Sequence, residues 1–435
     1  MKLQIQTITN QLKSARSAWQ TAALTTVTAL VYLLRAHPYL FKPQLFAEDG
    51  VIWLAEGHNK SVWTLLRPVN GFFHFPERLF GYVVARLPLQ LAPLIFVVSA
   101  WLLFILMTYY LLSSRTKIFT NNYERIFMVT ALCLIANINE LFFNFSNSVF
   151  LMGIIGTLIL LAQKPKNRLI AVAEKVFFVL SCFTLPFAWF YLPLALVERF
   201  KYKRKEWFFL VTSLIASIAQ GLCYIISHVN RSPITLLSLF SKWTLLELYN
   251  QMIVPAIRFA RIDIPVADYT AHHYSVFFVF LTVIALLIAT YAVLRKSNKQ
   301  VWYLLFFLAA MTFASVKSPT LSVKLPIDAL KTMAVVQGGS RYFVYGVLAV
   351  MIIYVKAAYL TFMPKARYIF LVVFISFGLL TSFHYQEFFI DKGFADYTHQ
   401  YSHAISQFQS GKVNTVDIPV NPVSWHMRLS RHAKH

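Results

Sequence analysis

The run PLIFVVSAWLLFILMTYYLL spans residues 93–112 and contains no charged side chain. About 20 apolar residues are the length that an α-helix needs to cross the hydrocarbon core of a bilayer. The run is followed by Arg115 and Lys117, and basic residues at the end of an apolar run are typical of the cytoplasmic side of a membrane span. Residues 93–112 therefore predict a transmembrane helix, and similar runs recur along the chain.

Apolar runs separated by basic clusters predict about 11 spans in this chain. They cover residues 19–36, 93–112, 125–138, 147–162, 207–227, 274–294, 301–316, 343–359 and 368–383, with two short segments forming a hairpin around Thr184-Leu185-Pro186. The short segments near residues 139 and 185 either enter the membrane without crossing it or belong to longer helices. With 58% hydrophobic and 13% charged residues, the chain is predicted to be an all-α polytopic membrane protein, because soluble domains carry far more charge.

The formal net charge of +23 does not indicate a nucleic-acid partner, because the basic residues fall in short clusters between apolar runs. With the N-terminus inside, the inner segments hold 20 of the 40 Lys and Arg residues and four acids, whereas the much longer outer segments hold 18 and 13. This contrast follows the positive-inside rule. It predicts a bundle over residues 1–383 with a cytoplasmic N-terminus, outer loops at 37–92, 228–273 and 317–342, and a small polar outer tail at 384–435. Arg35 and Lys356 fall inside spans, near enough to an end to snorkel.

The three cysteines, Cys133, Cys182 and Cys223, all lie in apolar runs, so no disulfide framework is expected. No pair of histidines or acids has the spacing of a metal site. The sequence also lacks a nucleotide-binding loop. We therefore predict neither a metal nor a cofactor.

The sextet Phe46-Ala47-Glu48-Asp49-Gly50-Val51 places two adjacent carboxylates just after the first span, in a chain with only 17 acidic residues. Adjacent carboxylates beside lipid raise each other's pKa, as a general base working near neutral pH requires. Asp49 is the favoured base, because Gly50 leaves its approach open, and Glu48 is the second candidate. Alternatively, the pair opens a surface helix over residues 47–57 and simply interacts favourably with the helix dipole.

The same outer loop carries further side chains that handle protons or bind anions. His58, Arg67, His74 and Glu77 are candidates for binding an acceptor or supporting the carboxylate pair.

The second candidate motif is Gln337-Gly338-Gly339-Ser340-Arg341-Tyr342, at the outer end of the tenth span. Glycines allow close backbone approach, and the planar guanidinium of Arg341 suits a phosphate. Lys324 and Lys331 precede the motif in the same loop and add positive charge. The alternative interpretation is a helix cap in which Arg341 binds lipid headgroups.

This layout resembles the GT-C superfamily of integral-membrane glycosyltransferases, which have an acidic pair after the first span in a long outer loop with a surface helix. Phe46-Ala47-Glu48-Asp49-Gly50, the short spans around Thr184-Leu185-Pro186, and Gly339-Ser340-Arg341-Tyr342 are similar to a bacterial branch of that group. The strings after the first span in well-studied members read differently, which leaves the sugar and the acceptor open.

The resemblance implies transfer of a sugar from a polyprenyl-phosphate donor to a glycan or lipid acceptor, among membrane lipids on the outer face of the bacterial inner membrane. Asp49 or Glu48 would activate the acceptor. The donor phosphate would be held by Arg341, Tyr342, Lys324 and Lys331.

Three other functions remain open. A transporter or flippase of a lipid-linked or anionic solute would place ionisable residues deep in the spans, where Arg35 and Lys356 are the candidates. A polysaccharide polymerase or ligase would rely on outer-loop arginines and would not need the acidic pair. A protein of interaction or assembly would need neither.

Overall fold

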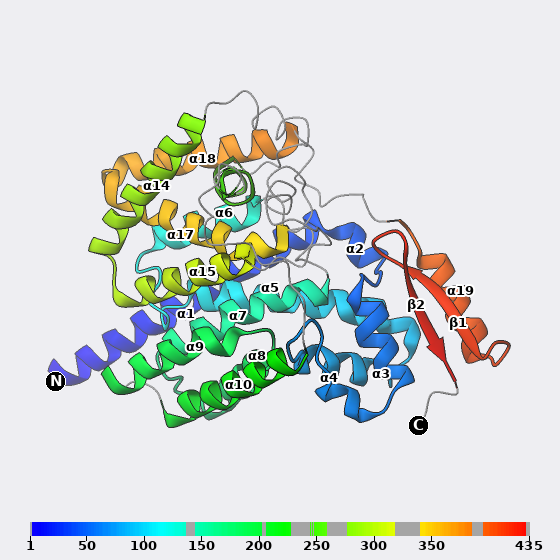
Figure 1. The fold of residues 1–435 in the computed structure, drawn as a ribbon. Helices are drawn as coiled ribbons and strands as arrows, with labels where there is room; N and C mark the ends of the chain where they lie inside the picture. The colour runs from blue at the N-terminus through cyan, green and yellow to red at the C-terminus, as the bar shows by residue number, and fades with distance from the viewer. Residues whose placement is uncertain are drawn as a thin grey trace.

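The computed structural model describes residues 2–135, 144–201, 206–227, 244, 246, 248–258, 276–317, 340–384 and 395–431. Most of these residues are helical, and the N- and C-termini lie at opposite ends of the molecule (Figure 1). The bundle contains α1 (Lys2–Arg35), α5 (Ala92–Leu112), α6 (Asn122–Leu134), α7 (Phe145–Leu161), α8 (Arg168–Cys182), α9 (Phe187–Leu196), α10 (Trp207–Ile226), α12 (Val254–Arg258), α14 (Val276–Lys296), α15 (Lys299–Lys317), α17 (Val344–Thr361) and α18 (Pro364–His384), with short turns η4 (Val197–Lys201), η6 (Tyr249–Ile253) and η7 (Ser340–Phe343).

Six helical segments of the described chain are long and apolar enough to cross a membrane: Leu89–Leu112, Trp207–Ile226, Val279–Lys296, Lys299–Val316, Arg341–Thr361 and Pro364–Phe383. The prediction of an α-helical membrane protein is confirmed at this level. The other predicted spans also coincide with helices, but these are shorter or less apolar. The hinge at Asn139-Glu140 lies outside the described residues.

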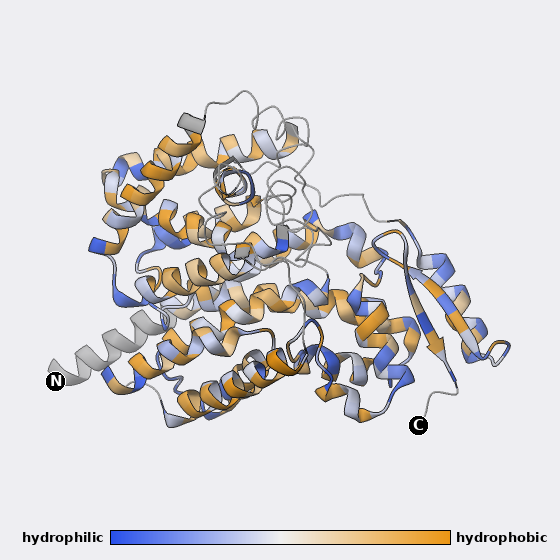
Figure 2. Cartoon of the chain, viewed as in Figure 1, coloured by the Kyte–Doolittle hydropathy of each residue, from blue (hydrophilic) through white to orange (hydrophobic). Residues whose placement is uncertain are grey.

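Helix α7 lies at the centre of the bundle, packed against α5, α8, α9 and α15, and its Phe150 carbonyl oxygen accepts the hydroxyl of Tyr345 on α17. All of its residues except Ser146 are buried, although it is apolar on every side (Figure 2). A helix that is hydrophobic all round needs either lipid or protein on each face, and here protein covers it. By contrast, α10 exposes a row of large apolar side chains: Val211, Leu214, Ile215, Ile218, Leu222, Ile225 and Ile226.

The two cations predicted to snorkel are instead buried and partnered. Arg35 is 2% exposed and donates to the carbonyl oxygens of Cys133 and Ile135, where α6 ends, at 2.5 and 3.0 Å. Lys356 is 5% exposed, and its Nζ lies 2.9 and 3.0 Å from the carboxylate oxygens of Glu124. The expectation failed because another helix supplies hydrogen-bond acceptors to each cation, and the sequence does not reveal which helix that is.

The short basic loops gather at one end of the bundle, as hydrogen bonds and ion pairs between them show. This arrangement is the one expected if every short loop lies on the same side of a membrane. The contacts join Arg115 to Gln163, Lys117 to Asn298, and Lys164 to Glu206.

The opposite end carries a cap built from the first long loop and the C-terminal tail. The loop contains α2 (His37–Phe41), η1 (Asp49–Leu54), α3 (Ala55–Asn59), η2 (Val62–Leu66), α4 (Phe75–Val84) and η3 (Leu89–Leu91). The tail contains α19 (Thr398–Gln409) and an antiparallel hairpin of β1 (Thr415–Val420) and β2 (Trp425–Ser430), in which Thr415 pairs with Ser430. The predicted all-α fold therefore also contains one small two-stranded sheet in the described tail.

Loop and tail share one apolar core, which includes Trp53, Leu54, Ile405 and Met427. The backbone of Asn421, just after β1, donates to the Leu45 carbonyl oxygen at 3.1 Å and accepts from the Ala47 N–H. The tail, predicted to be a small polar outer cap or an ordered strap, is folded against the loop that carries the acidic pair. Hydrophilic and hydrophobic residues are mixed along the tail (Figure 2).

Candidate functional site

Asp49 joins the first loop to the central helix. It opens η1, a short π-helix, and is only 1% exposed. Its carboxylate accepts the backbone N–H groups of Phe145 and Ser146 at 3.0 and 2.8 Å, and the Ser146 hydroxyl at 2.6 Å. These N–H groups open α7 and have no partner within the helix. A carboxylate is favoured there because the helix dipole is positive at its N-terminus.

The environment of Asp49 acts on its pKa in two directions. Burial raises the pKa from its ordinary value of 3.8 to about 7, opposed by the hydrogen bonds from Ser146 and Phe145 and aided by the charge of Glu48. Asp49 thus changes charge near neutral pH, chiefly because it is buried. Its oxygens, however, already face α7, so an acceptor hydroxyl has little access to them.

Glu48 differs from its neighbour in both exposure and contacts. The residue is half-buried, and its Oε2 atom is shielded from solvent without a hydrogen-bond partner. A buried carboxylate oxygen without a donor is costly, and an incoming hydroxyl would satisfy it. Glu48, unlike Asp49, therefore keeps a carboxylate oxygen that no hydrogen bond occupies.

A chain of contacts runs from Asp49 to His74 and Glu77. The Trp53 indole N–H donates to the Ser146 hydroxyl at 2.9 Å, and the Trp53 ring packs on His74 with 5.5 Å between centroids. His74 Nδ1 lies 2.9 Å from Glu77 Oε1, and both residues are buried. The two predicted supporting residues are thus brought together behind Trp53.

Glu56 holds together a second group of charged side chains. Arg67 is the member of this group that the sequence analysis named as a site residue. Its carboxylate lies 2.6 Å from both Arg78 and Lys60, and 3.5 Å from Arg67. Burial alone would raise the pKa of Glu56, but hydrogen bonds from Arg78 and Lys60 outweigh it and hold the pKa below its usual value. Glu56 could have been identified from the sequence, because a spacing of seven residues places it on the same helical face as Asp49.

His58 contacts the C-terminal tail. Its ring lies edge-on to Phe408, with 5.5 Å between centroids. The two line an open recess of about 510 Å³ together with Ala85, Leu87, Leu89, Gln409 and Arg431. The structure does not group His58 with the other predicted site residues.

Arg341 and Tyr342 lie in η7, at the same end of the bundle as the acidic pair. The Arg341 guanidinium is 5.1 Å from the centre of the Tyr342 ring, which packs edge-on against Phe150 at 6.0 Å. Phe150 is four residues after Ser146 on α7, about 6 Å along a helix axis. Both motifs therefore approach the first turns of α7. Lys324 and Lys331 lie outside the described residues.

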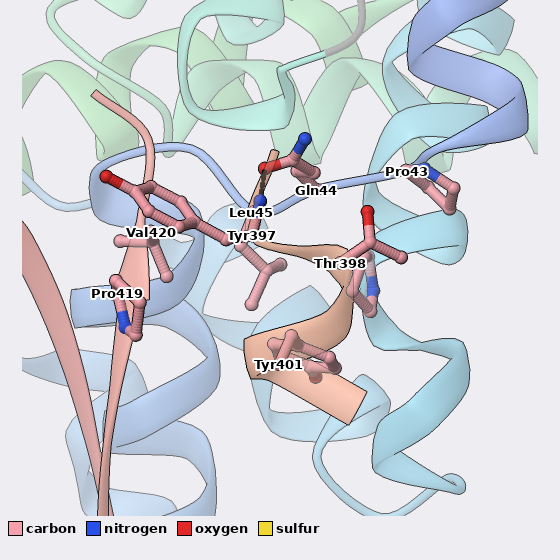
Figure 3. Close-up of a pocket in the computed structure, with 9 residues that line it drawn as sticks. Pro43, Gln44, Leu45, Tyr397, Thr398, Tyr401, Pro419 and Val420 are labelled. Atoms are coloured by element: carbon pink, nitrogen blue, oxygen red, sulfur yellow. Dashed lines mark hydrogen bonds between the residues drawn. The ribbon is translucent and has the colours of Figure 1, made fainter. Parts of the chain in front are cut away.

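A much smaller cavity marks the joint between loop and tail (Figure 3). Its volume is about 10 Å³, which is enough for about one water molecule. Gln44 lies in its wall and accepts the Tyr397 N–H at 3.1 Å. This cavity lies at the interface between the loop and the tail and is too small for a substrate.

No group of three or more His, Cys, Asp or Glu residues within the described part of the chain is placed to hold a metal ion. No protein-family model matches the chain, and neither curated proteins nor solved structures gave a match.

Proposed function

We propose that this protein is a membrane glycosyltransferase of the GT-C type. It would move a sugar from a polyprenyl-phosphate donor to a glycan or lipid acceptor at the capped end of the bundle. The observation that carries the proposal is the buried, unpartnered Oε2 of Glu48, next to an Asp49 that is anchored to the central helix. Partly desolvated carboxylates of this kind suit general bases.

In the proposed reaction Glu48 takes the proton of the acceptor hydroxyl. The hydroxyl oxygen forms a bond to the anomeric carbon, and the bond from that carbon to the phosphate oxygen breaks. The electron pair leaves with the polyprenyl phosphate, whose charge Arg341 stabilises. A pre-placed cation of this type contributes strongly to such catalysis. Asp49 acts as a positioning residue, because its hydrogen bonds hold η1 on α7.

The acidic pair and the Arg341-Tyr342 motif both contact α7. Asp49 binds the first turn at Ser146, and Tyr342 packs one turn later on Phe150. A donor phosphate near Arg341 and an acceptor hydroxyl near Glu48 would then meet beside the same helix end. This proximity supports one shared site over two separate ones.

We place the capped end on the outer side of a bacterial inner membrane, with about 11 spans, on the strength of charge. The opposite end carries the short basic loops and the N-terminus. The C-terminal tail then lies outside, against the first loop.

The transporter alternative gains no support from the described bundle. Its two intramembrane candidates are both partnered: Lys356 pairs with Glu124, and Arg35 binds carbonyl groups at the end of α6. Both side chains are buried against other helices, Arg35 at 2% and Lys356 at 5% exposure, so neither cation lies on an exposed surface of the described bundle.

The test is a strain without the native gene, complemented by variants that insert into the membrane at normal levels. Cell-surface glycans are read by mass spectrometry. Glu48→Gln and Arg341→Ala are expected to lose one sugar unit, and Arg341→Lys to retain part of it, because Lys keeps the charge but not the planar fork.

Matched controls are Asp417→Asn and Arg428→Ala, two exposed residues of the hairpin at the same end of the molecule. They should leave the glycan unchanged. A normal glycan in Glu48→Gln would reject the proposed base, and loss only in Arg341→Ala would favour the polymerase or ligase.

A further inference from the structure

The short 3-10 helix η2 presents an apolar face that no other described part of the protein covers. Trp63 is 74% exposed, Leu66 55% and Val62 47%. Side chains three residues apart eclipse each other on a 3-10 helix, so Trp63 and Leu66 share one face. A cluster of large exposed apolar side chains, including Trp, marks an interaction surface.

Cations flank this face on both sides. Lys60 precedes η2 and Arg67 follows it, and their side chains are 41% and 60% exposed. Both reach back to Glu56, which Arg78 also binds from the buried side. The Glu56 carboxylate therefore joins the residues on either side of η2, while the apolar side chains of η2 stay exposed.

The loop after η2 packs against α9 and α10, and α10 exposes apolar side chains suited to lipid. Phe72, six residues after η2, packs on Tyr224 of α10 and on Trp189 of α9, with centroids 5.6 and 5.8 Å away. At this end of α10, a candidate membrane span, Ile225 and Ile226 are 68% and 71% exposed. Figure 1 shows this loop beside the C-terminal end of α10.

We propose that η2 inserts Val62, Trp63 and Leu66 into the interfacial layer of the bilayer, with Lys60 and Arg67 among anionic headgroups. Trp favours this layer because its ring is apolar and its N–H is polar, and nearby basic residues are attracted to anionic lipids. The insertion would fix the depth of η1, and so of Glu48, relative to the membrane. The inference requires an embedded bundle but not glycosyl transfer.

The test uses the full chain with Cys133, Cys182 and Cys223, all buried, replaced by Ala. Trp63→Cys is labelled with an environment-sensitive fluorophore and reconstituted into phosphatidylethanolamine–phosphatidylglycerol liposomes with brominated acyl chains. We expect a blue-shifted emission that the bromine atoms quench. Val423→Cys, 64% exposed in the turn of the hairpin, is the control and should be quenched only by aqueous iodide.

Leu66→Cys supplies a second labelled position on the same face. Iodide quenching equal to that of Val423→Cys at both positions would overturn the insertion. A blue-shifted label that neither bromine nor iodide quenches would also overturn it, since it would indicate burial against protein. Neither outcome bears on the role of Glu48, which glycan analysis reports separately.

Discussion

The Asp49 carboxylate accepts both the backbone N–H and the hydroxyl of Ser146, at 2.8 and 2.6 Å. The two residues are 97 positions apart in the chain, yet this contact attaches the first long loop to the central helix. Glu48, one residue earlier, has a buried oxygen with no partner. The two adjacent acids thus differ in their contacts: Asp49 holds the loop on α7, and Glu48 keeps one carboxylate oxygen without a hydrogen-bond partner.

Replacing Asp49 by Ala should lower the free energy of unfolding by about 3 kcal/mol, because two buried N–H groups lose their acceptor. Asp49→Asn keeps one acceptor oxygen and should cost less. Thermal unfolding in detergent, with Asp417→Asn as the exposed control, measures both. Equal stability of wild type and Asp49→Ala would show that the contact contributes nothing.

The raised pKa of Asp49 predicts a pH dependence of stability. Below its ordinary value of 3.8 the group is protonated in both states, and between that value and about 7 only the folded state keeps the proton. The folded state binds more protons in this window, so the free energy of unfolding should fall as pH rises through it. The unfolding temperature of wild type minus that of Asp49→Asn should therefore decline from about pH 4 to pH 7 and level off above. A difference that rises with pH would contradict this.

Gly81→Ala should loosen the contact between α4 and η1. A Cβ at this position would overlap the backbone carbonyl of Trp53, whereas one at Gly221 meets nothing within 4 Å. Overpacking of this kind costs about 1–3 kcal/mol. Gly221→Ala on α10 is the matched control and should leave the unfolding temperature almost unchanged. Equal effects of the two substitutions would refute the close approach.

The buried pair of Lys356 and Glu124 should be structural. Lys356→Met leaves a buried carboxylate without its cation and should destabilise by about 3–5 kcal/mol. The double variant with Glu124→Gln should recover much of that loss and keep a normal glycan. A stable double variant without activity would instead show that the Lys356–Glu124 pair is needed for function.

Asn421 should hold the tail on the loop. Its side-chain amide donates to Gln44 Oε1 at 2.7 Å and to the Ala395 carbonyl at 3.0 Å, and its Oδ1 accepts the Ala395 N–H. Asn421→Ala leaves these groups unsatisfied and should cost about 1–3 kcal/mol. Limited proteolysis should then cleave the tail faster than in wild type. Lys42→Ala, which removes only an exposed ion pair to Asp396, should not change the cleavage rate.

The helices were predictable because an apolar run of sufficient length has few other stable forms. Their neighbours were not: α7 and α10 have similar apolar compositions, yet α7 is enclosed by protein and α10 faces outward on one side. In a membrane, lipid and protein satisfy an apolar face equally well. The partner of the tail was not predictable for a related reason, since the tail has few apolar residues and gains a core only by sharing that of the first loop.

By itself the sequence determined the class of protein, the position of most helices and the location of an acidic pair after the first of them. Those features follow from local composition, which each segment carries alone. Only the tertiary structure decided that Asp49 binds Ser146 while Glu48 keeps a buried oxygen without a partner, and that His58 belongs to another surface. Consecutive side chains project in different directions, so their partners depend on which distant helix end packs against each of them.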